Sequence, residues 1–174
     1  MYERFSGSRE RALRTLERSL LRPGNASSAE CVWIAEVGGE PAGVMAAFPV
    51  DEAHARSRAF FRLALRHAPF WCWPGALRVY VLGGRASPSP PAAAFYVDAL
   101  ATDDRFRRRG VARALLAEAE RQARARNLPS VALDTTLENG AARALYASEG
   151  FEEIAYRPPA RGLPGFVALV KEIG

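Results

Sequence analysis

Apolar residues recur at helical spacing in four segments of the chain: 9–21, 55–67, 110–126 and 140–149. In the clearest of them, 110–126, Val111, Leu115 and Ala119 follow one face among charged residues. Asn127 and Pro129 come directly afterwards and predict its end. These four segments are therefore predicted to be amphipathic helices.

Short apolar and β-branched runs predict strands between these helices, over residues 31–37, 41–50, 94–102, 131–135, 151–157 and 165–173. Gly38, Gly39 and Glu40 separate the first two strands, which predicts a β-hairpin. The second half then alternates strand, helix, strand, helix and strand. That order indicates an α/β protein with at least one crossover connection.

Two further stretches interrupt this regular pattern. Residues 70–77 form an aromatic cluster broken by prolines, and residues 83–93 (GGRASPSPPAA) predict a loop of polyproline character. Gly150 follows the last predicted helix where a left-handed cap belongs, and Phe151 follows as its hydrophobic partner.

Length and composition fit one globular domain. The 174 residues are 49% hydrophobic and 25% charged, and the chain has no run of ~20 apolar residues that could span a membrane. Its charged N-terminus does not resemble a signal peptide. Two cysteines, Cys31 and Cys72, are too few for a disulfide framework, so we expect a cytoplasmic protein.

The net charge of +5 comes almost entirely from arginine, with Lys171 the only lysine. Such a bias is typical of GC-rich coding, but a positive surface also suits a phosphorylated ligand or a nucleic acid. Composition alone does not choose between these.

The segment DDRFRRRGVA lies between the strand ending at Thr102 and the helix starting near Gly110. Small residues at Gly110 and Ala112 would let a ligand's phosphates approach backbone N–H groups at the positive end of the helix dipole. The pattern is neither a Walker loop nor a complete dinucleotide fingerprint. An ordinary turn with solvated arginines is an alternative, and a nucleic-acid-binding run at 105–109 is a weaker one.

The surrounding sequence resembles the acetyl-CoA-binding core of the GNAT superfamily of N-acetyltransferases. Over residues 94–157 it has, in order, Leu-Ala-Thr ending a strand, Arg-x-x-Gly-x-Ala opening a helix, a second strand, Asn139, and Ala-Leu-Tyr before Gly-Phe. The resemblance implies a single α/β domain over 1–174, with a mostly antiparallel mixed central sheet flanked by helices. Residues 51–93 would then be an insertion on the acceptor side.

The resemblance also implies an activity: transfer of an acetyl group from acetyl-CoA to a primary amine, by direct attack in a ternary complex and without a metal. Tyr146 would be the acid that protonates the leaving thiolate. The residues implied to bind acetyl-CoA are Leu100, Ala101, Thr102, Arg107, Arg108, Arg109, Gly110, Val111, Ala112, Arg113 and Asn139. Asn139 alone would equally suit a helix N-cap, and Tyr146 a core aromatic residue.

The general base is less clearly indicated. Asp98 alternates with Tyr96 and Leu100, so these side chains are predicted to share one face of the strand, where Asp98 could take the ammonium proton. Asp134 is a weaker candidate, and His67 lies on an apolar helical face that favours packing. Phe60, Phe61, Phe70, Trp71 and Trp73 would line an acceptor pocket or simply cover the sheet.

One departure from the family concerns the N-terminus. Members usually begin with a strand, whereas residues 1–24 predict helix with only 1–5 left over. A sheet without that strand would have an exposed edge, so we expect that a second chain could pair there. Two other functions stay open: an acyl-CoA sensor that lacks turnover, and a basic nucleic-acid-binding module.

Overall fold

The computed structural model describes residues 8–86, 88–160 and 163–174. Its centre is a six-stranded sheet in the order β1-β2-β3-β4-β6-β5. The strands are β1 (Val32–Val37), β2 (Glu40–Pro49), β3 (Ala94–Thr102), β4 (Ser130–Thr136), β5 (Glu152–Arg157) and β6 (Phe166–Glu172). Only β3 and β4 pair in parallel, and the other neighbours are antiparallel. The mostly antiparallel mixed sheet predicted from the sequence is confirmed.

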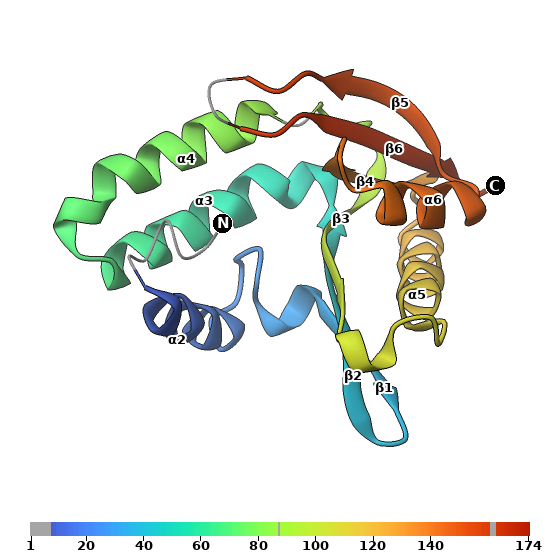
Figure 1. Cartoon of the computed structure of the whole chain (residues 1–174), viewed down its shortest axis with the longest axis horizontal. Coiled ribbons are helices and arrows are strands. Elements are labelled where there is room, and N and C mark those ends of the chain that lie inside the picture. The colour runs from blue at the N-terminus through green and yellow to red at the C-terminus, as the bar shows by residue number, and fades with distance from the viewer. Residues whose placement is uncertain (1–7, 87, 161–162) are drawn as a thin grey trace.

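Helices lie on both faces of this sheet (Figure 1). One face carries α5 (Val111–Ala125) and α6 (Gly140–Ser148), and α5 links the parallel strands β3 and β4. The other side carries α2 (Arg9–Leu20), α3 (Val50–His67) and α4 (Trp73–Ala86). Three short 3₁₀ turns complete the described elements: η1 (Ala29–Cys31), η2 (Phe70–Cys72) and η3 (Asp104–Phe106).

The largest hydrophobic core lies between the sheet and α5, and the apolar stripe predicted for that helix supplies it. Val111, Leu115 and Ala119 are all buried there against inward side chains of the strands. Gly43 of β2 allows this close packing, because a Cβ at that position would lie 2.5 Å from Cγ1 of Val111. A smaller cluster around Phe48 and Cys31 lies on the opposite side, and Phe60 of α3 packs against it.

The two helices between β2 and β3 differ most from expectation. The helix predicted over 55–67 begins already at Val50, directly after Pro49 ends β2, and Asp51 and Glu52 lie in its first turn. Acidic side chains are favourable there, because that end of a helix carries partial positive charge. The break between strand and helix is too short to be recognised from the pattern alone.

The prediction of an irregular aromatic stretch followed by a loop is wrong for residues 73–86, which form α4. Pro74 lies in the first turn, where a missing N–H does not interrupt the helical hydrogen bonds. Trp73, Leu77 and Val81 follow one another at i,i+4 spacing but are exposed. The stripe therefore faces solvent, and the loop begins only after Ala86.

The predicted absence of a first strand holds over the described residues, since residues 8–31 contain α2 and η1 but no strand. Residues 1–7, which include the segment left over in the sequence prediction, lie outside the described part. β1 forms one edge of the sheet.

The pairing of β3 with β4 ends part-way along both strands. Their last paired row is Val97 with Leu133, although β3 continues to Thr102 and β4 to Thr136. Beyond that row β3 pairs only with β2. Backbone groups of β3 that point toward β4 therefore have no ladder partner, and the two strands diverge around a gap in the sheet.

Candidate functional site

A pocket of about 700 Å³ lies where β3 ends and α5 begins. Its lining includes eight of the residues predicted to bind acetyl-CoA: Thr102, Arg107, Arg108, Gly110, Val111, Ala112, Arg113 and Asn139. Phe106, Ala141, Ala142 and Leu145 complete the lining and were not singled out in the sequence. The loop before α5 and the start of α6, about 30 residues apart in the chain, thus form one site.

Backbone geometry at this end of α5 leaves N–H donors available. Gly110 precedes the helix with φ +80°, Arg108 has φ 61°, and no side chain caps the helix. The N–H groups of Val111, Ala112 and Arg113 therefore have no acceptor within the described chain. Donors and dipole together make this pocket suited to an anion such as a phosphate.

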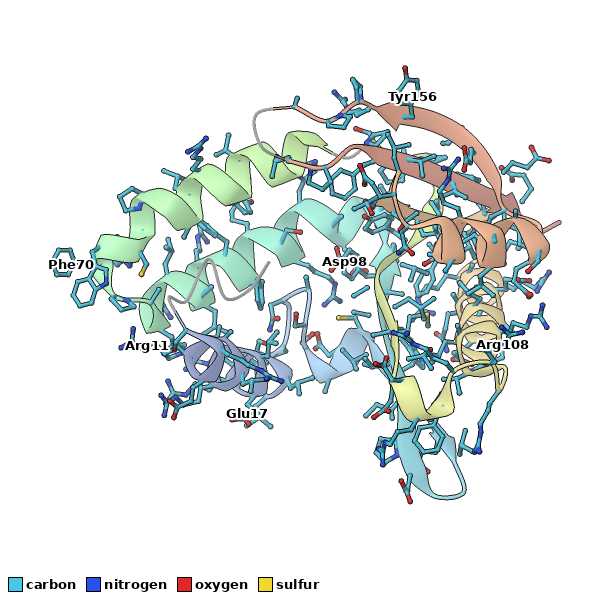
Figure 2. All side chains as sticks on the ribbon, viewed as in Figure 1. Arg11, Glu17, Phe70, Asp98, Arg108 and Tyr156 are labelled. Atoms are coloured by element: carbon cyan, nitrogen blue, oxygen red, sulfur yellow. The ribbon has the colours of Figure 1, made fainter. Side chains whose placement is uncertain are left out.

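The arginines around the pocket are arranged unequally. Arg107 forms an ion pair with Asp104 at 2.6 Å, and Arg113 with Glu149 at 2.6 Å. Arg109 instead lies over the ring of Phe106, 5.7 Å from its centroid, and does not line the pocket. Arg108 lines the pocket beside the start of α5 (Figure 2), and no ion pair of Arg108 occurs among the described residues.

Asn139 lies at the start of α6, at the edge of the pocket. Its side-chain oxygen accepts from the N–H of Ala142 at 3.3 Å, so it is the N-cap of α6. Its amide nitrogen donates to Thr135 Oγ1 at 3.2 Å. The same residue lines the pocket, so one side chain both begins α6 and faces the cavity.

Leu100 and Ala101 lie outside the pocket lining. Both belong to the part of β3 beyond its pairing with β4, where Leu100 pairs with Met45 and Ala101 with Val44 of β2. They thus border the gap between β3 and β4 rather than the pocket itself.

Asp98 lies on the opposite face of the sheet from the pocket. Figure 2 places it beside β3 on the side of α3, whereas Arg108 lies beside α5. The register of β2 against β3 shifts here, because Ala46 pairs with Ala99 and Ala47 with Val97. Asp98 is therefore the extra residue of a β-bulge, a feature that re-aims a side chain.

Water reaches the Asp98 carboxylate, but protein surrounds it on most sides. This loss of hydration, with the charge of Asp134 as a second cause, raises the pKa of Asp98 from 3.8 to about 6. An aspartate with that pKa accepts a proton near neutral pH much more readily than an ordinary surface aspartate does.

Tyr96 and Asp134 lie beside Asp98, although neither was a leading candidate in the sequence. The Tyr96 hydroxyl donates to Asp134 Oδ1 across the parallel pair of strands. Burial, then the charges of Asp134 and Asp98, raise the pKa of Tyr96 well above 10. In both β3 and β4 an apolar run is followed by an aspartate, in Tyr-Val-Asp98 and in Ala-Leu-Asp134. This shared pattern is the sequence signal from which the proximity of the two aspartates could have been predicted.

Tyr146 lies on α6, on the same side of the sheet as the pocket. It is buried, 7% exposed, and packs against the ring of Phe151 with centroids 6.0 Å apart. The Phe151 N–H bonds to the Tyr146 carbonyl at 3.0 Å around Gly150, whose φ is +85°, so the predicted left-handed cap is confirmed. Burial, and secondarily the charge of Asp134, raise the pKa of Tyr146 above its ordinary value of 10. Tyr146 is not among the residues that line the pocket.

The aromatic cluster of the insertion does not line this site. Phe70, Trp71 and Trp73 are 74%, 67% and 48% exposed, and Phe70 lies at the far end of the α3–α4 pair from Asp98 (Figure 2). The prediction that these three form acceptor walls is therefore wrong. Phe61 stacks on Tyr80 of α4 at 4.2 Å, and Phe60 is the aromatic residue of the five that packs beside Tyr96 and Phe48.

His67 joins two helices. Its Nδ1 accepts from Arg18 of α2 at 2.8 Å, and loss of hydration followed by the charge of Arg18 lowers the pKa of His67. Within the described residues, no group of three or more His, Cys, Asp or Glu side chains could hold a metal ion. Nor is any helix of the described part long and apolar enough to cross a membrane.

A family model covers most of the chain: the acetyltransferase (GNAT) family model matches residues 1–151. The chain belongs to the GNAT acetyltransferase family. Solved structures similar to this GNAT protein include one described as an acetyltransferase, at 20% identity and TM-score 0.71, covering 96% of this chain and 82% of the other. A search of curated proteins gives no match.

Two further solved structures have the same fold. An N-acetyltransferase from Staphylococcus aureus Mu50 is 18% identical with TM-score 0.70, over 93% of this GNAT protein and 81% of that chain. A Bacillus anthracis str. Ames protein described as a streptothricin acetyltransferase, in complex with acetyl coenzyme A, is 15% identical with TM-score 0.56, over 82% of this chain and 62% of that chain. At these identities the likeness establishes the fold alone.

Proposed function

We propose that this GNAT protein transfers an acetyl group from acetyl-CoA to a primary amine by direct attack in a ternary complex. One observation carries the proposal. β3 and β4 stop pairing after Val97 and Leu133; Asp98, whose pKa is raised, lies next to that row on the α3 face, and the pocket suited to an anion lies on the α5 face, where β3 ends. Two substrates that approach from opposite faces can react there without a covalent enzyme intermediate.

In this proposal the pocket binds the acetyl-CoA pyrophosphate. The backbone N–H groups of Val111, Ala112 and Arg113 donate to phosphate oxygens, and Arg108, which forms no ion pair among the described residues, adds positive charge. Arg107 also lines the pocket, with its charge offset by Asp104. Arg109 contributes through its contact with Phe106 rather than directly. Leu100, Ala101 and Thr102 offer unpaired backbone groups to the pantetheine amides, and Asn139 contacts the same arm.

Each proton of the reaction has a proposed acceptor. Asp98 takes one proton from the acceptor R–NH₃⁺, and the resulting amine attacks the thioester carbonyl carbon. The C–S bond breaks, Tyr146 protonates the departing thiolate, and the second proton lost from the nitrogen returns to Tyr146. The raised pKa of Tyr146 keeps its hydroxyl protonated throughout the neutral pH range.

The alternatives make different predictions. An acyl-CoA sensor of the same fold would bind acetyl-CoA but release no CoA in a manner that depends on Tyr146. Nucleic-acid binding has less support, because Arg105 and Arg107 are ion-paired with neighbouring acidic residues. The two free cysteines, Cys31 and Cys72, fit a reducing cytoplasm.

Calorimetric titration with acetyl-CoA tests the proposal through Gly110→Glu. A carboxylate at Gly110 would repel the pyrophosphate, so the wild type should bind in the micromolar range and the variant at least about tenfold more weakly. Gly38→Glu is the matched control, because Gly38 has a similar φ of +64° and an equally open surrounding in the β1–β2 turn. Absence of binding by folded wild-type protein would overturn the proposal.

A further inference from the structure

Two carboxylates border the same end of the β3–β4 pairing. Val97 and Leu133 are the last paired residues, and Asp98 and Asp134 are the next residue of each strand. Parallel neighbouring strands lie ~4.8 Å apart, so the two backbones remain close at this row. Carboxylates so placed do not ionise independently, because the charge of one raises the proton affinity of the other.

The surroundings of Asp98 and Asp134 differ, and because of this difference the two carboxylates have different roles. Tyr96 donates a hydrogen bond to Asp134, and a donated hydrogen bond stabilises the ionised carboxylate. Tyr96 is itself held in place by packing against Phe48 and against the buried cluster of Ala94, Ala132 and Val170. Asp98 has no such hydrogen bond among the described residues, and it lies at the bulge, where water reaches it.

We propose that Tyr96 and Asp134 are positioning residues for proton transfer: Tyr96 holds Asp134 as a fixed negative charge, and that charge makes Asp98 the carboxylate that accepts the proton. The inference rests on the proposed function, in which Asp98 removes a proton from the acceptor ammonium. Neither Tyr96 nor Asp134 needs to touch the substrate.

The pKa shifts around the gap agree with these roles of Tyr96, Asp134 and Asp98. Loss of hydration and then Asp134 raise the pKa of Asp98 to about 6. The charge of Asp134 also raises the pKa of Tyr96 and of Tyr146, so three groups around the gap respond to this one carboxylate. Tyr96 therefore stays a hydrogen-bond donor over the whole pH range in which Asp98 titrates.

The other elements next to Asp98 contribute little charge. The residues of β2 paired beside it, Ala46 and Ala47, are apolar. The first turn of α3 carries Asp51 and Glu52, and Glu52 forms an ion pair with Arg56 at 2.6 Å. Asp51 is exposed and therefore gives a matched acidic control on the same side of the sheet.

Carboxyl-carbon NMR titration of the unliganded protein tests the inference, with the Asp98 signal assigned by its absence in Asp98→Asn. The wild-type Asp98 signal should titrate near 6. Asp134→Asn should lower that midpoint by about 0.5–1 pH unit, while the loss of hydration, the larger cause, still keeps it above the ordinary value. Tyr96→Phe should move the Asp98 midpoint in the same direction as Asp134→Asn does, because the hydrogen bond that stabilises the ionised Asp134 is lost.

Asp51→Asn should leave the Asp98 midpoint unchanged. An Asp98 midpoint that is the same in Asp134→Asn and wild type, or that moves equally in Asp51→Asn, would overturn the inference. Because the titration needs no substrate, its failure is distinct from a failure of acetyl-CoA binding at Gly110.

Discussion

At the scale of single residues, Asp98 has a raised pKa that suits it to accept a proton but that also lowers the free energy of unfolding of the protein. Its pKa of about 6 in the folded protein lies above the ordinary aspartate value of 3.8, so folding disfavours its charged form. The penalty is fully present above pH 6 and disappears as the pH falls from about 6 toward 3.8, since the folded protein then protonates Asp98. Because water still reaches the side chain, the effect is smaller than that of a sealed carboxylate.

Asp98→Asn should therefore make the protein more stable than wild type at pH 7.5, with the difference vanishing near pH 4. Urea unfolding at a series of pH values measures this directly, through the free energy of unfolding of the two proteins. Glu172→Gln, at an exposed position on β6, controls for the simple loss of a negative charge. A difference that grows as the pH falls would contradict the raised pKa.

At the scale of elements, the start of α6 couples local stability to the pocket. Asn139 caps the helix through Ala142 and also lines the cavity, while Gly150 and Phe151 close the other end around Tyr146. A nine-residue helix has little intrinsic stability in isolation, so its caps and its packing hold it in place. The position of Tyr146 on this helix therefore depends on both ends.

Two substitutions of Asn139 separate these functions. Asn139→Ala should lower the free energy of unfolding by about 1 kcal/mol, because the cap is lost, whereas Asn139→Asp keeps an accepting oxygen and should change it by less than about half of that. Both should weaken acetyl-CoA binding, the aspartate through repulsion of the phosphates. Urea unfolding combined with calorimetry measures the two effects, and equal losses of stability in both variants would contradict the capping role.

At the scale of the whole molecule, the sheet of the described residues ends in β1 on one side and β5 on the other. Trp33, Ala35 and Val37 of β1 point toward the main core, while Ile34 is 61% exposed. An edge strand with an outward apolar residue can pair with a second copy.

Light scattering at high protein concentration should therefore give twice the mass of one chain, and Ile34→Lys should return the mass to that of a monomer. Val44→Lys is the control: Val44 pairs with Ile34 and is 41% exposed, but it lies on the interior strand β2. A monomeric mass for the wild type, or equal dissociation by both lysines, would contradict pairing through β1.

Much of the fold and of the pocket could be predicted from the sequence. Periodicity placed α5, α6 and all six strands to within about two residues. Most of these elements bury one face and the apolar spacing records it, although every residue of β5 is exposed. The sequence also indicated the loop before α5, because its small residues and lack of a cap are local properties. The helix α4 could not be predicted, since Trp73, Leu77 and Val81 face solvent and the prolines nearby indicated a break.

The residue pattern thus indicated the strands, α5, α6 and the loop before α5, and it singled out Asp98, while Tyr146 was indicated through the family resemblance. Only the tertiary structure decided that β3 and β4 diverge after Val97 and Leu133, and that Tyr96, Asp98 and Asp134 meet there. The physical reason is that register between strands and the loss of hydration at a bulge depend on residues about 36 positions apart. The apolar periodicity describes one element at a time, so it contains neither the register between strands nor the hydration of a side chain at a bulge.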